Sequence, residues 1–362
     1  MRVLIFCPCP IDRELGAAQV HLNLSAALRA RGHVAAVWAP PPLPEAIPPR
    51  LGLWWARAQL EKKLRQDEPF DVIDCPPVLP CRRLVDSGGR WVARSTQPDA
   101  LYAWHQIRGN LRPSMRALRH AVVDGLWGGF VAVTAYQGMR AAHVVVCHSE
   151  REKAWLGDTF PSLRSRLHAY GGAISDEERA ILARVRRTRQ RNTGRAARFL
   201  WIGRWTQHKG IDTLLTFLRS RLDRPTDETF TIAGCGQEGL NALAPFHDSG
   251  RVRVVPSYGR RELPDLLASH DAGLFTSHVE GWGLVLNEMV EAGLPIYATP
   301  AGGVDELRAV FGSFVQAFPP AVDSTMPPQP TEETFVRYES AFSWSAVADR
   351  YLKALGQAGV GR

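Results

Sequence analysis

Two glutamates eight residues apart flank a glycine-containing turn in the second half of the chain. The string Glu280-Gly-Trp-Gly-Leu-Val-Leu-Asn-Glu288 follows an apolar run of strand character at residues 272–276. Its glycines allow a ligand to approach the backbone, and the helix expected from Leu284 directs its N-terminal N–H groups into the same space. A carboxylate can accept from two neighbouring hydroxyl groups, so the pattern favours a sugar ligand. In the plainer interpretation, Glu280 caps the helix and Glu288 is a solvated acid.

A second motif, Gly203-Arg-Trp-Thr-Gln-His-Lys-Gly210, places two cations on a loop. It follows an apolar run at residues 198–202 and leads into a helical stretch. Arg204 offers a planar fork of donors and Lys209 a point charge, which together with helix N–H groups suit a diphosphate. The spacing does not fit G-x-x-x-x-G-K-[ST], so a kinase or ATPase has no support. Taken alone, an arginine and a lysine on a loop are more often ordinary surface charge.

Both motifs follow strand-like runs, so parallel strands must position them. Five apolar runs in each half of the chain alternate with helical stretches, which predicts two doubly wound α/β domains. Ligands of such sheets bind beyond the carboxyl ends of the strands, and two facing domains would leave a cleft there. The runs lie at residues 3–7, 34–38, 71–75, 90–94 and 143–147, and then at 198–202, 229–233, 251–255, 272–276 and 294–298.

Changes in composition predict the domain boundaries. We expect an N-terminal domain at residues 1–175 and a polar, arginine-rich linker at 176–197. A second domain would occupy residues 198–331, and a C-terminal helical segment residues 332–362.

The composition restricts the function classes. With 362 residues, 45% of them hydrophobic, the chain can bury more than one core. No uncharged apolar run is long enough to span a membrane and the N-terminus lacks a signal-peptide pattern, so we expect a cytoplasmic protein. The net charge of +8 arises in the first half, where residues 1–175 hold 22 Lys and Arg against 14 Asp and Glu. Such an excess suits an anionic substrate, an anionic membrane or nucleic acid, although a solvated basic face explains it equally well.

Metal and dinucleotide signals are weak. The six cysteines form no C-x-x-C pair and have no histidines at zinc spacing, so we expect reduced, structural thiols. There is no H-E-x-x-H and no D-x-D motif, and we expect neither a metal nor another cofactor. Gly234-Cys-Gly-Gln-Glu-Gly239 satisfies G-x-G-x-x-G, but the strand after it ends without an acidic residue to hold a ribose, which disfavours a nicotinamide site.

The ordered motifs resemble the nucleotide-sugar-binding half of the retaining glycosyltransferases of family 4, also called group 1. A weaker likeness includes Gly16-Ala17 and Arg31-Gly-His33 in the first domain and Phe342-Ser-Trp344 in the tail. The resemblance implies the GT-B architecture, in which two Rossmann-like domains face each other across a cleft. The first would bind the acceptor and the second the donor, and the C-terminal helix would pack back on the first. The main motifs span residues 198–312: Ile202-Gly-Arg, Lys209-Gly-Ile-Asp, Ile232-Ala-Gly-Cys-Gly, Glu280-Gly-Trp-Gly and Ala301-Gly-Gly-Val-Asp-Glu-Leu.

The resemblance implies a role for each motif residue. Glu288 would bind the ribose hydroxyls and Glu280 the donor sugar. Arg204 and Lys209 would hold the diphosphate and stabilise its charge as it leaves, so catalysis would depend on Arg204, Lys209 and Glu280. The expected donor-binding residues are Gly16, Ala17, Gly203, Arg204, Lys209, Gly281, Trp282, Gly283, Leu284 and Glu288. The expected acceptor-side residues, which follow a first-domain strand where the family often has a histidine, are Arg94, Ser95, Thr96 and His105.

By resemblance, the protein transfers a sugar from a UDP- or GDP-sugar to a glycan, a lipid-linked glycan or a small molecule, with retention of configuration and without a metal. The family is commonly proposed to use a same-face displacement, in which the leaving diphosphate takes the acceptor proton. Two alternatives remain open: a GT-B sugar-nucleotide epimerase and a non-catalytic nucleotide-sugar-binding protein. Nucleic acid is not an expected partner.

Four arginines in the first half recur near helical spacing, beside Tyr102 and Trp104. They would suit peripheral contact with an anionic membrane, on its inner face, or with an anionic acceptor. A plain amphipathic helix explains the same spacing. These residues are Arg108, Arg112, Arg116 and Arg119.

Overall fold

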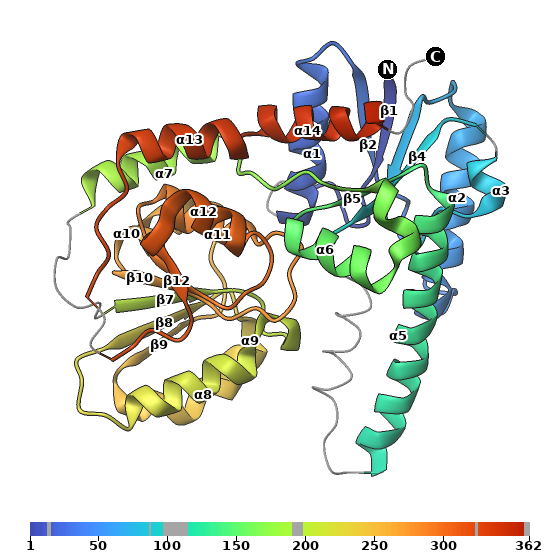
Figure 1. The fold of residues 1–362 in the computed structure, drawn as a ribbon. Helices are drawn as coiled ribbons and strands as arrows, with labels where there is room; N and C mark the ends of the chain where they lie inside the picture. The colour runs from blue at the N-terminus through green and yellow to red at the C-terminus, as the bar shows by residue number, and fades with distance from the viewer. Residues whose placement is uncertain (13–15, 87, 97–114, 190–197, 323–324, 358–362) are drawn as a thin grey trace. The chain divides into compact units, whose positions relative to one another are not determined.

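The computed structural model describes residues 1–12, 16–86, 88–96, 115–189, 198–322 and 325–357. The chain forms two compact units. The first comprises Met1–Gly172 together with Trp344–Arg362, and the second comprises Ala173–Ser343. Each unit contains a six-stranded parallel sheet accompanied by helices (Figure 1). Among the residues described, no helix combines the length and apolar character needed to cross a bilayer.

The sheet of the first unit has the strand order β2-β1-β3-β4-β5-β6. Its strands are β1 (Arg2–Phe6), β2 (Val34–Trp38), β3 (Val72–Cys75), β4 (Arg90–Ser95), β5 (Val144–Cys147) and β6 (Leu167–Ala169). The central strands are almost wholly buried, as expected for a parallel sheet with both faces covered. The helices are α1 (Gly16–Arg29), α2 (Gly52–Gln66), α3 (Arg82–Val85), α5 (Met115–Ala141), α6 (Glu150–Thr159) and α14 (Trp344–Gln357).

The sheet of the second unit has the strand order β12-β11-β10-β7-β8-β9. Its strands are β7 (Arg198–Ile202), β8 (Thr229–Ala233), β9 (Val252–Val255), β10 (Ala272–Phe275), β11 (Ile296–Ala298) and β12 (Val315–Ala317). Side chains alternate between two cores, so that Leu200 lies in one cluster and its neighbours Phe199 and Trp201 in the other. The helices are α7 (Asp176–Thr188), α8 (Ile211–Leu222), α9 (Gly236–Leu243), α10 (Leu263–Ala268), α11 (Leu284–Glu291), α12 (Val304–Phe311) and α13 (Glu332–Phe342).

The prediction of two doubly wound parallel sheets is confirmed. Each of the ten apolar runs overlaps a strand. Strands β6 and β12, of three residues each at sheet edges, were not predicted. Such short segments carry too little periodicity to be distinguished from a loop.

The structure differs from the predicted boundaries at two places. The first half of the expected linker is helix α7, which belongs to the second unit. Although the segment is polar, Ser175 and Glu178 form a capping box at its N-terminus. Its Leu182 is buried in the core of the second unit. The expected C-terminal helical segment is two helices, of which α13 belongs to the second unit and α14 to the first.

Candidate active site

The two motifs of the second unit follow neighbouring strands of its sheet. Strands β7 and β10 run in parallel, with Leu200 opposite Gly273. The chain continues from β7 to β8 and β9 on one side and from β10 to β11 and β12 on the other, so the strand order reverses between β7 and β10. In open α/β sheets, ligands bind beyond the carboxyl ends of the strands at this reversal. The cationic loop and the glutamate turn both begin there.

The cationic loop begins with Gly203 and Arg204. A Cβ at Gly203 would lie 2.9 Å from the Trp201 ring, so the turn requires a residue without a side chain. Arg204 is exposed, and within the described part of the chain it pairs with no carboxylate. Its guanidinium is therefore accessible to an anionic ligand.

The same loop ends at Gly210, which has a left-handed conformation (φ 68°) directly before α8. A Cβ there would lie 1.8 Å from the carbonyl oxygen of Thr276, at the end of β10. The Thr276 hydroxyl donates to the carbonyl oxygen of Lys209 (2.8 Å) and accepts from Trp201 Nε1 (2.9 Å). These contacts fix the Lys209 backbone against the neighbouring strand.

An ion pair joins the two motifs. Lys209 Nζ lies 2.7 Å from Glu280 Oε2, and each side chain is only 16% exposed. Lys209 belongs to the short 3-10 turn Gln207–Lys209, and Glu280 lies in the turn after β10. The structure thus brings together two of the predicted site residues that are 71 positions apart.

The turn after Glu280 is shaped by Gly283, whose left-handed conformation (φ 87°) begins α11. The side chain of Trp282 is buried inside the unit, where its Nε1 donates to Asn287 Oδ1. The centroid of its ring lies 5.3 Å from the centroid of the Phe342 ring. The side chain of Trp282 is therefore buried, and the side chain of Leu284 packs partly into the core. Gly281 is buried as well. These three predicted donor-binding residues can offer a ligand mainly their backbone groups.

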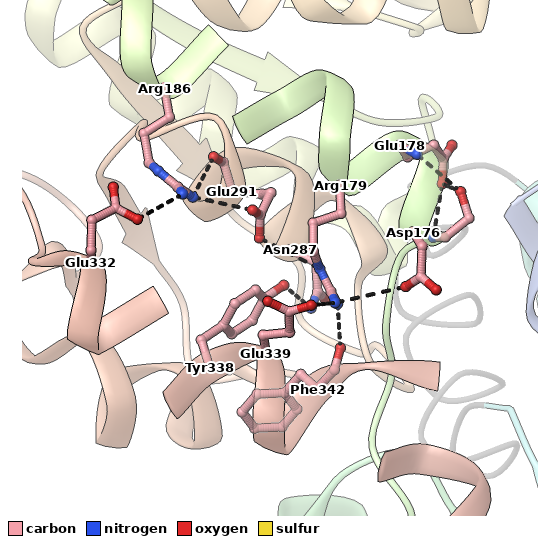
Figure 2. A network of polar contacts seen from close by, with 11 residues as sticks. Asp176, Glu178, Arg179, Arg186, Asn287, Glu291, Glu332, Tyr338, Glu339 and Phe342 are labelled. Atoms are coloured by element: carbon pink, nitrogen blue, oxygen red, sulfur yellow. Dashed lines mark hydrogen bonds and ion pairs between the residues drawn. The ribbon is translucent and has the colours of Figure 1, made fainter. Parts of the chain in front are cut away.

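Polar contacts anchor α11 on the side of α7 and α13 (Figure 2). Arg186 of α7 donates to Glu291 Oε1 of α11 (3.1 Å), and Arg179 donates to the carbonyl oxygen of Phe342 (3.0 Å). Asn287 donates to the Tyr338 hydroxyl (2.7 Å). Burial raises the pKa of Glu291 above its ordinary value, and the two arginines oppose that shift. The helix that carries Glu288 is therefore firmly held.

Glu288 lies one turn into α11, and its side chain is 5% exposed. Arg260 Nη1 donates to Glu288 Oε1 (2.8 Å), and Arg260 Nη2 donates to Glu178 Oε1. Burial raises the pKa of Glu288, whereas Arg260 opposes the rise. Neither Arg260 nor Glu178 belongs to the motifs from which the site was predicted. The available signal was that Arg260 lies in the loop after β9, at the carboxyl edge of the same sheet.

The remaining predicted residues belong to the first unit. Gly16 is exposed and begins α1, and Ala17 lies in the same turn. Thr96 is exposed just after β4. Ser95 is buried and donates to Glu152 Oε1. His105 lies outside the described residues.

Arg94 is buried in a polar network rather than exposed to an acceptor. Its guanidinium is 1% exposed and donates through Nε to Asp74 Oδ1 (2.9 Å) and through Nη2 to Oδ2. The hydroxyl of Tyr351, on α14, donates to the same carboxylate (2.7 Å). This arrangement departs from the predicted acceptor role and joins α14 to strands β3 and β4, because a buried guanidinium needs a counter-charge.

The fold and the site define the class of protein. The structure of sucrose-phosphate synthase from Thermosynechococcus elongatus matches with a TM-score of 0.64 and 15% identity, covering 99% of this chain and 96% of that one. At this level of identity the likeness concerns the fold, which is that of the GT-B glycosyltransferases, with one Rossmann-like sheet in each unit.

Sequence comparison finds a matching family model in the second half of the chain. Residues 196–318 match the family model of glycosyl transferases group 1, the family that the motifs in this segment resemble. D-inositol 3-phosphate glycosyltransferase from Corynebacterium diphtheriae is 25% identical over 199 residues, 47% of each chain. Glycogen synthase from Mycobacterium tuberculosis is 37% identical over 114 residues, 30% of this chain and 27% of the relative. The matches thus cover less than half the length of either curated relative.

Proposed function

We propose that this protein is a retaining glycosyltransferase that transfers a sugar from a nucleoside-diphosphate donor to a hydroxyl acceptor. The observation that carries the proposal is the Lys209–Glu280 pair, which lies with Glu288 at the strand reversal of the group 1 segment. Carboxylates recognise hydroxyl groups and cations recognise phosphates, so one nucleotide-linked sugar satisfies all three side chains. A UDP- or GDP-sugar is the proposed donor.

Donor binding would exchange the partners of the ion pair. Lys209 and Arg204 would bind the diphosphate, Glu280 would turn to the sugar hydroxyls, and Glu288 would accept from the ribose. Until the donor arrives, the ion pair keeps Lys209 and Glu280 beside each other at a distance of 2.7 Å. Because the two cations already supply positive charge for the diphosphate, we propose catalysis that does not depend on a metal ion.

In the proposed reaction, the bond between the acceptor oxygen and the anomeric carbon forms on the face from which the diphosphate departs. The bond between that carbon and the phosphate oxygen breaks, and the departing oxygen takes the acceptor proton. Lys209 and Arg204 would stabilise the charge that develops on the diphosphate. No enzyme nucleophile takes part in this scheme.

We further propose that the first unit meets an anionic acceptor or a lipid-linked acceptor at a membrane surface. The net positive charge of residues 1–175 supports this, because Lys and Arg are attracted to anionic lipids. Trp54 of α2 and Phe130 of α5 stack with centroids 5.5 Å apart and remain 45% and 38% exposed. Exposed aromatic rings combined with basic charge suit the interface of a bilayer.

The proposed function is tested with the full-length chain and a panel of UDP-, GDP- and ADP-sugars. Release of the nucleoside diphosphate, even by slow hydrolysis, supports transfer, whereas an isomerised donor indicates an epimerase and binding without turnover indicates a sensor. We expect Glu288→Ala to abolish nucleotide binding and Lys209→Ala to lower turnover strongly, since a charge-assisted hydrogen bond contributes about 1.5–3 kcal/mol. Wild-type binding and turnover in both variants would refute the site.

A further inference from the structure

Arg260 lies between two carboxylates that come from different helices. It belongs to the 3-10 turn Arg260–Glu262 after β9, and its side chain is 24% exposed. One terminal nitrogen, Nη1, donates to Glu288 on α11, and the other, Nη2, donates to Glu178 on α7. The planar fork of a guanidinium makes both contacts at fixed geometry, which a lysine ammonium could not reproduce.

The contact from Arg260 engages only one of the two carboxylate oxygens of Glu288. Oε1 accepts from Arg260 at 2.8 Å, and no described residue donates to Oε2. The carboxylate is therefore oriented through one oxygen, and the other retains its capacity to accept from a hydroxyl group. Since the side chain is almost fully buried, its charge also depends on a nearby cation.

Glu178 is itself held by the first turn of α7. Its Oε2 accepts from the backbone N–H of Ser175 (3.2 Å) and from the Ser175 hydroxyl (3.0 Å), which completes the capping box. Burial opposes ionisation of Glu178, but the hydrogen bond from Arg260 holds its pKa below the ordinary value. A continuous chain of contacts therefore runs from the start of α7 through Arg260 to Glu288.

We propose that Arg260 is a positioning residue for nucleotide recognition, which holds the Glu288 carboxylate in the orientation that receives the ribose hydroxyls, and that Glu178 holds Arg260 in turn. The inference rests on the proposed function, because it assumes that Glu288 binds the donor. It assigns a role in nucleotide recognition to the loop after β9 and to the first turn of α7.

The proposal predicts a change in the pH dependence of binding. The charged and titratable groups that face Glu288 are Arg260, Glu178, Lys209 and Tyr258. Burial raises the pKa of Glu288, and Arg260 provides the largest opposing influence. Without Arg260 that pKa rises further, and the carboxyl group becomes protonated at higher pH. Because an acid is ionised above its pKa, binding should then be lost as the pH falls and recovered as it rises.

The test measures binding of UDP, GDP and ADP by calorimetry between pH 6 and 9, using the full chain. We expect Arg260→Gln to lose about tenfold in affinity for each pH unit below the raised pKa of Glu288 and to recover toward pH 9. Arg260→Lys should restore part of the affinity at low pH. Glu178→Gln, which retains a capping-box acceptor, should cause a smaller loss. The matched control is Arg261→Gln, because Arg261 is the adjacent, exposed arginine and should bind as the wild type does.

Two results would overturn the proposal. One is wild-type affinity in Arg260→Gln at every pH. The other is a loss that is equal at every pH and that Arg260→Lys does not relieve, which would indicate a structural role. Glu288→Gln distinguishes failure of the proposed donor site from failure of the proposed positioning role of Arg260. If it binds as the wild type does, the donor site itself is wrong, whereas a loss in Glu288→Gln with unchanged Arg260→Gln removes only the positioning role.

Discussion

Replacing Gly210 with alanine tests whether the close packing of two loops sets the position of Lys209. The new Cβ would lie 1.8 Å from the Thr276 carbonyl oxygen, whereas real Cβ contacts stay beyond 3.0 Å. The backbone must therefore move by about 1.2 Å, judged from that contact distance. The hydrogen bond from the Thr276 hydroxyl to the Lys209 carbonyl oxygen, now 2.8 Å, lies directly beside this contact and would be lost.

The cost has three parts. An alanine in the left-handed conformation costs about 1–2 kcal/mol. Overpacking against the Thr276 backbone adds about 1–3 kcal/mol, and the lost hydrogen bond about 1 kcal/mol. The free energy of unfolding should therefore fall by roughly 3–6 kcal/mol. Displacing Lys209 should also weaken nucleoside-diphosphate binding by roughly 10- to 100-fold, the value of one charge-assisted hydrogen bond.

Gly250→Ala is the matched control for backbone conformation. Gly250 has nearly the same left-handed conformation (φ 64°), but its Cβ would meet no atom within 4 Å. Only the conformational cost of about 1–2 kcal/mol then applies, and binding should stay at the wild-type level. Urea unfolding of the full chain measures stability, and calorimetry with UDP, GDP and ADP measures binding.

Equal losses of stability in Gly210→Ala and Gly250→Ala would show that the close approach to Thr276 does not contribute to the change in the free energy of unfolding. Wild-type nucleotide affinity in Gly210→Ala, despite lowered stability, would show that the Lys209 backbone position does not govern binding. Either result refutes the reasoning that the two loops form one rigid site.

Two further predictions concern the first unit. Asp74→Asn removes the counter-charge of the buried Arg94 and should destabilise the protein by about 3–5 kcal/mol, whereas Tyr351→Phe removes one hydrogen bond and should cost about 0.5–1.5 kcal/mol. Thermal unfolding measures both, and a smaller loss in Asp74→Asn than in Tyr351→Phe would contradict the ranking. The full chain should sediment with vesicles of anionic phosphatidylglycerol and not with vesicles of neutral phosphatidylcholine. Trp54→Ser should weaken the association, whereas Val336→Ser, at an exposed apolar residue of the second unit, should leave it unchanged. Absence of binding to anionic vesicles would remove the proposed membrane contact.

Much of the fold could be predicted from local sequence patterns. Apolar runs such as residues 3–7 and 198–202 become buried parallel strands, because covering both faces of a sheet demands continuous apolar side chains. The helix α7 was not predicted, because its many arginines make the segment polar and few of its residues are buried. The buried residues are Arg179, Leu182 and Ala183. Those arginines make contacts inside the second unit, which composition does not reveal.

The candidate site was predicted in part. Lys209 and Glu280 could be selected because each belongs to a glycine-containing motif directly after a strand, and strands that end at one edge bring such motifs together. Arg260 and Glu178 belong to no such motif, and their pairing joins residues 82 positions apart. Trp282 was predicted to bind the donor because it lies between motif glycines, and Arg94 was predicted to face the acceptor because it lies at the end of a strand. In the structure both side chains are buried.

By itself, the sequence determined that this chain forms two doubly wound sheets and that cations and carboxylates directly follow two strands of the second sheet. That the strands run in parallel follows from the alternation of strands and helices, which is a local property. The order of the strands, and with it the reversal between β7 and β10, was decided only by the tertiary structure. Only the tertiary structure decided that Arg260 links Glu178 to Glu288, and that Arg94 has Asp74 and Tyr351 as partners. Partners of buried charges depend on distances between remote segments, and those distances exist only once the cores have packed.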